Sequence, residues 1–375
     1  MKEGWEYKKL GEVCNIEFGT RVVRSRDAGS IYPVYGGGGA TFKMDMYNRE
    51  DCMVISRFGM SEQCTRFVKG KFFLNDSGLT LSMKENCMIQ EFMDWQILYL
   101  NNTIYSLGRG AAQKNLDTKA LADVRITYPH NLSEQQSFVD YLDSAFAKID
   151  AMKANAEKRL NEAQALFQAS LKKMLEPKEG WEEKILQDIC SDIVDCPHTT
   201  PKKVGFPTQY PCIRTSELRG GSIDWSTMQY LDEDEYKKRV SRLVPKANDL
   251  VYGREGTYGD AVLLPDGYSF SLGQRTMLLR ANEIYIIPRF LLYSMISPHV
   301  YQQAKEKNSG CGVGHVNVKD IKVFRVGLPT IDTQQSIVET LDSLKSKVDR
   351  LQANYEKISQ ECDALKQAIL RQVFE

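Results

Sequence analysis

Basic and amide side chains gather on glycine-rich stretches in both halves of this 375-residue sequence. Their guanidinium, ammonium and amide groups can bond phosphate oxygens and the edges of purine bases. The candidates in the first half are Arg21, Arg24, Arg26, Tyr35, Arg57, Arg66, Lys69, Arg109, Gln113, Lys114 and Asn115. The candidates in the second half are Lys202, Lys203, Arg214, Thr215, Arg219, Arg254, Tyr258, Gln274, Arg275, His315 and Asn317. Any single member is more often a solvated surface residue, but as a group they favour binding of double-stranded nucleic acid.

Sequence patterns of the common catalytic and metal sites are absent. The nine cysteines contain no C-x-x-C pair, which argues against a zinc ribbon. The glycine run 36–39 is not followed by Lys-Ser/Thr, so it predicts a flexible hairpin or a loop beside a nucleic-acid backbone rather than a phosphate loop. No H-E-x-x-H, G-x-S-x-G or Asn/Asp-Pro-Pro-Tyr/Phe run occurs. We therefore expect no catalytic residue, metal or cofactor on this chain.

The charge balance excludes a polycation. Lys plus Arg and Asp plus Glu both number 49, so the formal net charge is zero. Bulk attraction to phosphate is then small, and a partner would have to supply much of it. The first residues lack the apolar run of a signal peptide, and no stretch of 18 apolar residues occurs. We expect a cytoplasmic protein.

Two motifs recur in the same order. Residues 4–14 and 180–190 each begin with Gly-Trp-Glu and have a leucine at the same spacing. Residues 121–137 and 321–336 each lead through an apolar strand pattern and a proline to Gln-Gln-Ser. The intervening sequences barely match. Duplicated ends around divergent middles predict one scaffold that presents two recognition surfaces. The alternative is a duplicated enzyme whose middles drifted.

Two stretches, 133–175 and 333–374, lack glycine and proline and carry apolar residues at alternating spacings of four and three. This pattern predicts two long coiled-coil helices. Ser133 and Gln136 predict a capping box at the start of the first helix. Small residues in the first seam favour an antiparallel pair within one chain, and pairing between chains is the alternative. The predicted seam residues are Ile149, Met152, Leu341, Leu344, Val348, Leu351, Ile358 and Leu365.

The expected fold class is α+β, with two α/β recognition domains joined by the helix pair in a pseudo-two-fold repeat. Strand and turn signals in both middles predict curved or barrel-like sheets. The predicted domains are residues 1–132 and 177–331, and the predicted spacer helices are 133–176 and 332–375.

The order of these motifs resembles that of the specificity subunits of type I restriction-modification systems. The resemblance covers nearly the whole chain, and its recurrence is more specific than any one motif. The second copy departs from the Glu-Gln-Gln pattern at Thr333. The segments that carry the resemblance are the openers 4–6 and 180–182, the glycine-rich turns 110–116 and 310–316, and the motifs Glu134-Gln135-Gln136 and Thr333-Gln334-Gln335.

The resemblance implies a non-catalytic subunit in which each variable domain is a target recognition domain for one half of a split, asymmetric DNA sequence. The helices would form the spacer and dock two copies of a modification methylase subunit, which carries S-adenosylmethionine, and a restriction/translocase subunit would join the assembly. No contact residue follows from the resemblance, so the candidate residues rest on the loops alone. A coiled-coil structural adaptor with protein-binding end domains is the alternative.

Overall fold

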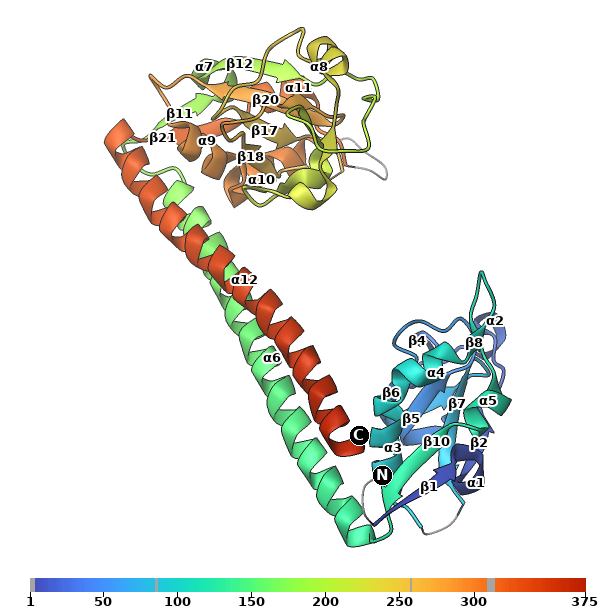
Figure 1. Ribbon diagram of the computed structural model, residues 1–375. Helices are drawn as coiled ribbons and strands as arrows, with labels where there is room; N and C mark the ends of the chain where they lie inside the picture. The colour runs from blue at the N-terminus through green and yellow to red at the C-terminus, as the bar shows by residue number, and fades with distance from the viewer. Residues whose placement is uncertain (1–3, 85–86, 257, 309–313) are drawn as a thin grey trace. The chain divides into compact units, whose positions relative to one another are not determined.

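The computed structural model describes residues 4–84, 87–256, 258–308 and 314–375 (Figure 1). The chain forms two compact units. Unit 1 comprises Met1–Ala156 and Tyr355–Glu375, and unit 2 comprises Glu157–Asn354. Two 44-residue helices, α6 (Leu132–Leu175) and α12 (Ile331–Phe374), each contribute residues to both units. The predicted domain boundaries follow the helix ends, whereas the compact units divide both helices.

A six-stranded sheet forms the body of unit 1, in the order β2-β7-β5-β6-β3-β4. All neighbours are antiparallel except β3 and β6, where Val34 lies opposite Phe73. Successive side chains of β5 point to opposite faces, so Ile55 joins the main core while Val54 joins a smaller one. The strands are β2 (Cys14–Phe18), β3 (Tyr32–Gly36), β4 (Gly39–Met44), β5 (Arg49–Ser56), β6 (Thr65–Leu74) and β7 (Gly78–Met83).

The main core of unit 1 lies between the sheet and helix α3. Phe92 and Met93 of α3 are fully buried and share this core with Leu79 of β7. The short helix α5 begins where the Asp117 carboxylate accepts hydrogen bonds from the backbone N–H groups of Lys119 and Ala120. The remaining elements are α1 (Leu10–Val13), α2 (Arg24–Asp27), α3 (Gln90–Tyr99), α4 (Asn101–Ser106), β8 (Gly108–Arg109), β9 (Asn115–Leu116) and α5 (Thr118–Ala122).

Unit 2 contains a four-stranded sheet, β12-β20-β17-β18, with a three-stranded sheet, β16-β13-β19, and the pair β14-β15. Strand β17 is buried on both faces, because Tyr252 packs in the core beside α9 while Val251 packs in a second core. The strands are β12 (Cys190–Asp195), β13 (Pro211–Ile213), β14 (Leu218–Arg219), β15 (Ser222–Ile223), β16 (Gln229–Tyr230), β17 (Leu250–Gly253), β18 (Ala261–Leu263), β19 (Ser271–Leu272) and β20 (Thr276–Ala281). The helices are α7 (Leu186–Ile189), α8 (Glu233–Arg239), α9 (Pro288–Met295), α10 (Pro298–Glu306) and α11 (Val318–Lys322), with the 3₁₀ turns Thr215–Glu217 and Trp225–Thr227.

The recurrent motifs form the same frame in both units. In unit 1, β1 (Trp5–Lys9) pairs antiparallel with β10 (Arg125–Pro129). In unit 2, β11 (Glu182–Ile185) pairs in the same way with β21 (Arg325–Leu328). The leucine that follows each opener is fully buried and donates its backbone N–H across the frame, 2.8 Å in unit 1 and 3.0 Å in unit 2. The repeat seen in the sequence is therefore a repeat of backbone architecture.

A buried glutamine anchors each long helix to its own unit. Gln135 accepts a 2.9 Å hydrogen bond from the backbone N–H of Ile89 and donates a 2.8 Å bond to the carbonyl of the proline that ends β10. Gln334 accepts a 2.9 Å bond from Ile287 and donates to the proline that follows β21 at 3.1 Å. Neither glutamine is exposed. These equivalent hydrogen bonds explain why the middle residue of the Glu-Gln-Gln motif recurs in the second half.

The cap of the first helix lies two residues earlier than the capping box predicts, at Asn131 and not at Ser133. The side-chain oxygen of Asn131 accepts a 2.8 Å hydrogen bond from the backbone N–H of Ser133. Asn131 therefore caps α6, which starts at Leu132.

Within unit 1, two ion pairs join the helices. The Lys153 ammonium lies 3.3 Å from the Asp363 carboxylate, and the Lys366 ammonium lies 2.5 Å from the Asp150 carboxylate. As residue numbers rise on α6, they fall on α12, so the two helices run antiparallel.

Two predicted seam residues, Met152 and Leu365, are wrong. Met152 is 59% exposed and Leu365 is 48% exposed. The next residues, Lys153 and Lys366, lie on the seam instead, because a lysine can lay its apolar stem across the interface while its ammonium reaches the facing helix. A search for apolar spacing selects the methionine and the leucine, and so the predicted seam shifts by one residue at both places.

In unit 2 the helices share one core with the sheet. Phe167 and Leu171 of α6 are buried in the same cluster as Ile337 and Leu341 of α12. Two members of the predicted seam, Ile149 and Leu341, are buried. The partly buried members of the predicted seam are Leu344, Val348, Leu351 and Ile358.

Candidate nucleic-acid interface

In unit 1, the turn after β5 and the loop between β8 and β9 lie together. The backbone N–H of Leu116 donates to the Arg57 carbonyl at 2.8 Å, and that of Met60 donates to the Lys114 carbonyl at 2.9 Å. These main-chain bonds hold two of the predicted basic segments against each other.

The β3–β4 turn joins them through Gly37. Its carbonyl accepts hydrogen bonds from Ser56 Oγ at 2.6 Å and Arg66 Nη2 at 2.5 Å, and its N–H donates to Ser77 Oγ at 3.1 Å. A Cβ atom at this position would lie 2.8 Å from the Phe58 carbonyl oxygen, so the close approach requires glycine. The glycine run is thus a hairpin turn, one of its two predicted forms.

The Arg57 guanidinium lies between two aromatic rings. Its Cζ is 4.7 Å from the centroid of Phe18 and 4.5 Å from that of Phe58, and Nη1 donates to the Asp76 carbonyl at 3.4 Å. Among the described residues, no carboxylate is ion-paired with Arg57 or Arg66. The Arg66 guanidinium donates to backbone carbonyls instead. Both charges are therefore uncompensated, and unpaired cations beside exposed backbone loops favour an anion such as phosphate.

Two other cations of these loops already have partners. The Arg109 guanidinium is 80% exposed and lies 2.5 Å from the Asp117 carboxylate. The backbone N–H of Ala120 and the Arg109 charge both lower the pKa of Asp117. The Lys114 ammonium lies 3.9 Å from the centroid of the Tyr105 ring. These contacts position the two side chains without removing them from solvent.

The other candidates of unit 1 are less concentrated. Tyr35 is half-buried with its ring edge against Phe72, so it serves the core. Arg26 is bonded to Asp27 at 2.8 Å. Lys69 lies in β6 beyond the strand end that carries Arg66. The exposed candidates are Arg21, Arg24, Arg26, Lys69, Gln113 and Asn115.

Unit 2 repeats the loop arrangement. The backbone N–H of Val316 donates to the Arg254 carbonyl at 2.9 Å, which matches the bond between Leu116 and Arg57 in unit 1. The Arg254 N–H donates in turn to the Arg275 carbonyl at 3.0 Å. Three predicted segments therefore meet here, although part of the glycine-rich turn 310–316 lies outside the described residues, which resume at 314.

The charges of these loops are compensated, unlike those of Arg57 and Arg66. Arg254 is 4% exposed and lies 3.0 Å from the Asp195 carboxylate and 3.1 Å from that of Glu255. Glu255 also pairs with Arg275 at 3.4 Å and with His315 at 3.2 Å. Arg254 therefore holds the loops together from inside and does not reach the surface in this arrangement.

Most other candidates of unit 2 are also engaged. Arg214 is ion-paired with Glu217, which is fully buried, and Arg219 lies 3.8 Å from the Asp224 carboxylate. The exposed ammonium groups of this region belong to the neighbouring residues Lys202 and Lys203. The remaining candidates, exposed or partly buried on nearby loops, are Thr215, Tyr258, Gln274 and Asn317.

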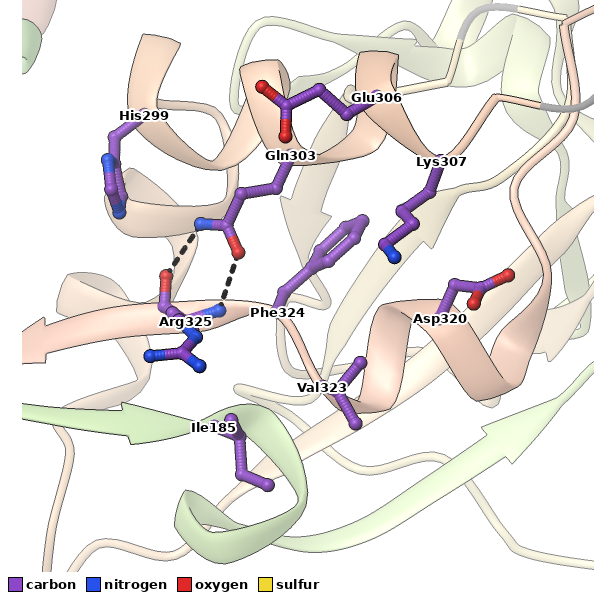
Figure 2. A pocket seen from close by; sticks show the side chains of 9 residues that line it. All are labelled: Ile185, His299, Gln303, Glu306, Lys307, Asp320, Val323, Phe324 and Arg325. Carbon is purple, nitrogen blue, oxygen red and sulfur yellow. Dashed lines mark hydrogen bonds between the residues drawn. The ribbon is translucent and has the colours of Figure 1, made fainter.

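A cavity of about 600 Å³ in unit 2 includes none of the predicted residues. Figure 2 shows that Gln303 of α10 bonds both backbone groups of Arg325, accepting from its N–H at 2.8 Å and donating to its carbonyl at 2.9 Å. Acidic and basic side chains mix on its walls, which gives it no single charge preference. The lining residues are Ile185, His299, Gln303, Glu306, Lys307, Asp320, Val323, Phe324 and Arg325.

Sequence reasoning missed two kinds of positioning residue. Gln135 and Gln334 belong to sequence motifs that suggest no role for them, and their recurrence at matching places is the signal that identifies them. Arg239 belongs to a run of three basic residues that looks like a solvated helix face, yet it is only 5% exposed. No local signal separates it from its neighbours.

Within the described ranges, no group of three or more His, Cys, Asp or Glu side chains could hold a metal ion. The described part of the chain also contains no helix that is long and apolar enough to span a membrane.

Comparison with known proteins gives one consistent result. Residues 2–162 and 178–360 match the family described as type I restriction modification DNA specificity domain. The EcoBI type I restriction enzyme specificity subunit of Escherichia coli is 21% identical over 70% of this chain, which spans 60% of that relative's length. The MjaVIII specificity subunit of Methanocaldococcus jannaschii is 19% identical, with 96% of this chain and 90% of the relative covered. A solved structure of a type I restriction-modification system, 14% identical, has a similar fold, with a TM-score of 0.73 and 100% and 98% of the two chains covered.

Proposed function

The chain belongs to the type I restriction-modification DNA specificity family, and on this basis we propose that it is the non-catalytic subunit that recognises a bipartite, asymmetric DNA target. The observation that supports this most is the repeated frame. The same backbone bonds, Leu116 to Arg57 and Val316 to Arg254, carry loops with different side chains in the two units. One scaffold that holds two dissimilar loop sets suits a target with two dissimilar halves.

The two surfaces differ in their chemistry. Unit 1 offers uncompensated guanidinium groups at Arg57 and Arg66, whereas the exposed Arg275 of unit 2 is paired with the Glu255 carboxylate. Paired side chains present fixed donors and acceptors with little net charge, which suits reading of base edges. Unpaired cations contribute affinity for phosphate in addition.

The proposal includes protein partners. The helix pair and the frames would dock two copies of a modification methylase subunit, with S-adenosylmethionine bound on that partner, and a restriction/translocase subunit would complete the cytoplasmic assembly. The zero net charge supports a division of labour in which the partner supplies much of the phosphate contact.

Selection from a randomised duplex pool tests the proposal. The full chain, alone and together with its methylase partner, is incubated with the pool at several stated salt concentrations, because phosphate contacts make affinity strongly salt-dependent. We expect one split motif to be enriched. Failure to enrich a bipartite motif at any salt concentration, with the partner present, refutes the proposal.

Joint substitution separates this function from a protein-binding adaptor. Replacing Arg57 and Arg66 with alanine should abolish selection by unit 1 while leaving partner binding intact. If the double variant keeps DNA selection but loses a protein partner, the adaptor interpretation is the better one.

A further inference from the structure

Arg239, the last residue of α8, is a buried cation without a carboxylate partner in the described part of the chain. Arg239 is 5% exposed. On the same helix, Lys237 forms an ion pair with Glu233 at 2.7 Å, and Arg239 takes no part in it. Its guanidinium donates only to backbone carbonyls. Nε and Nη2 reach the Leu272 carbonyl at 3.1 and 2.8 Å, and Nη1 reaches that of Thr199 at 3.1 Å.

These bonds join two loops that carry candidate contact residues. The Thr199 loop continues into Lys202 and Lys203, and Leu272 leads directly into Gln274 and Arg275. A second tie links the same two loops at the surface, because the Gln274 amide donates to the His198 carbonyl at 3.1 Å.

A buried charge is costly unless hydrogen bonds satisfy it, and the carbonyl oxygens do so here without cancelling the net charge. Arg254 and Arg214, by contrast, have carboxylate partners. The positive potential of Arg239 therefore persists at the loops above it, where low dielectric strengthens its effect on a nearby anion. A guanidinium fork with several donors also fixes the loops in one arrangement, which a single ammonium cannot do.

We propose that Arg239 is a positioning residue for DNA recognition by unit 2: it locks the loops 197–203 and 272–275 into one reading surface and adds buried positive charge beneath a phosphate of the bound duplex. This inference rests on the proposed function and adds to it a specificity-determining residue that touches no base.

The experiment compares variants of the full chain, purified with its methylase partner, on the randomised duplex pool and on duplexes with either half-site scrambled. Arg239→Gln removes the charge and the fork. Arg239→Lys keeps the charge only. Arg242→Gln is the matched control, because it removes one positive charge from an exposed arginine three residues away.

Arg239→Gln should lower discrimination at one half-site by about tenfold or more, the range expected when a well-placed base contact is lost, and leave the other half-site unchanged. Arg239→Lys should restore part of the affinity and its salt dependence but not the discrimination. Arg242→Gln should behave as the wild type. Hydrogen exchange should show faster exchange at residues 197–203 in both Arg239 variants, with β17 and β20 still protected.

Full discrimination by a folded Arg239→Gln chain, or an equal loss at both half-sites, overturns the inference. If Arg239→Gln does not fold, Gln274→Ala replaces it. That variant removes the surface tie between the same loops together with a candidate contact, so unchanged discrimination at both half-sites then overturns the inference. A wild-type complex that selects no split motif overturns the proposed function itself.

Discussion

The end of α12 completes the core of unit 1, and one substitution measures how much it contributes. Phe374 is 6% exposed, its ring edge contacts Phe92 at a centroid distance of 5.4 Å, and it stacks on Tyr99 at the same distance. Truncating a buried phenylalanine to alanine costs about 3–5 kcal/mol. The two ring contacts place Phe374→Ala toward the upper part of that range, since aromatic pairs contribute about 0.5–1.5 kcal/mol each beyond area.

Hydrogen exchange measured by mass spectrometry is the suitable assay, because a chain with two compact units need not unfold in one step. Phe374→Ala should weaken protection in α3 and in the end of α12 by roughly three orders of magnitude or slightly more, since each 1.4 kcal/mol is about tenfold. Protection in β17 and β20 of unit 2 should not change. Leu365→Ala, on the same helix but 48% exposed, is the control and should cost less than about 1 kcal/mol.

Two results would refute this reasoning. One is a loss below about 1 kcal/mol for Phe374→Ala, which would mean that the helix end does not belong to the core. The other is an equal loss for Leu365→Ala, which would restore the apolar seam predicted from the sequence.

Three further outcomes are expected. Burial raises the pKa of Asp94 from 3.8 to about 7, so the folded chain keeps a proton that the unfolded chain releases. The free energy of unfolding should therefore fall as pH rises between these values, by at most roughly 4 kcal/mol. Urea unfolding at pH 5 and pH 8 should show this fall in the wild type and none in Asp94→Asn. Arg57→Ala should weaken binding at one half-site only and reduce the slope of log affinity against log salt by about one, as titrations at several salt concentrations can check; equal weakening at both half-sites contradicts the modular arrangement. Removing seven residues from both α6 and α12 in register should change the preferred gap between half-sites in the selected motif while leaving each half-site unchanged, and an unchanged gap contradicts the spacer role.

The sequence predicts the frame well because its signals are local. The Gly-Trp-Glu openers, the proline and the Gln-Gln pair recur in the same order in both halves, and the openers and prolines border the paired strands of each frame. The long helices follow from the uninterrupted apolar period. The predicted seam is wrong where Lys153 and Lys366 take the place of apolar residues. A search for apolar residue types does not detect the apolar stem of a lysine.

The interface is less predictable because charge compensation is a long-range property. Arg57 and Arg254 occupy equivalent turns and look alike in the sequence. Arg254 is neutralised by Asp195, which lies 59 residues earlier, whereas Arg57 meets aromatic rings instead. The adjacent residues Glu255 and Phe58 account for part of this difference, but Asp195 and Phe18 are distant in the sequence. The partners of Arg239 are likewise carbonyl groups of distant loops.

The sharing of one core by distant parts of the chain has a consequence for biosynthesis. Leu370, Val373 and Phe374 belong to the same core as Phe92 and Ile97. A ribosome adds about 5–20 residues per second, so the intervening two hundred or more residues take roughly 10–50 s to make. During that interval the nascent unit 1 exposes the apolar surface of α3 that α12 later covers. Until the helix emerges, this exposed apolar surface makes the nascent chain prone to aggregation.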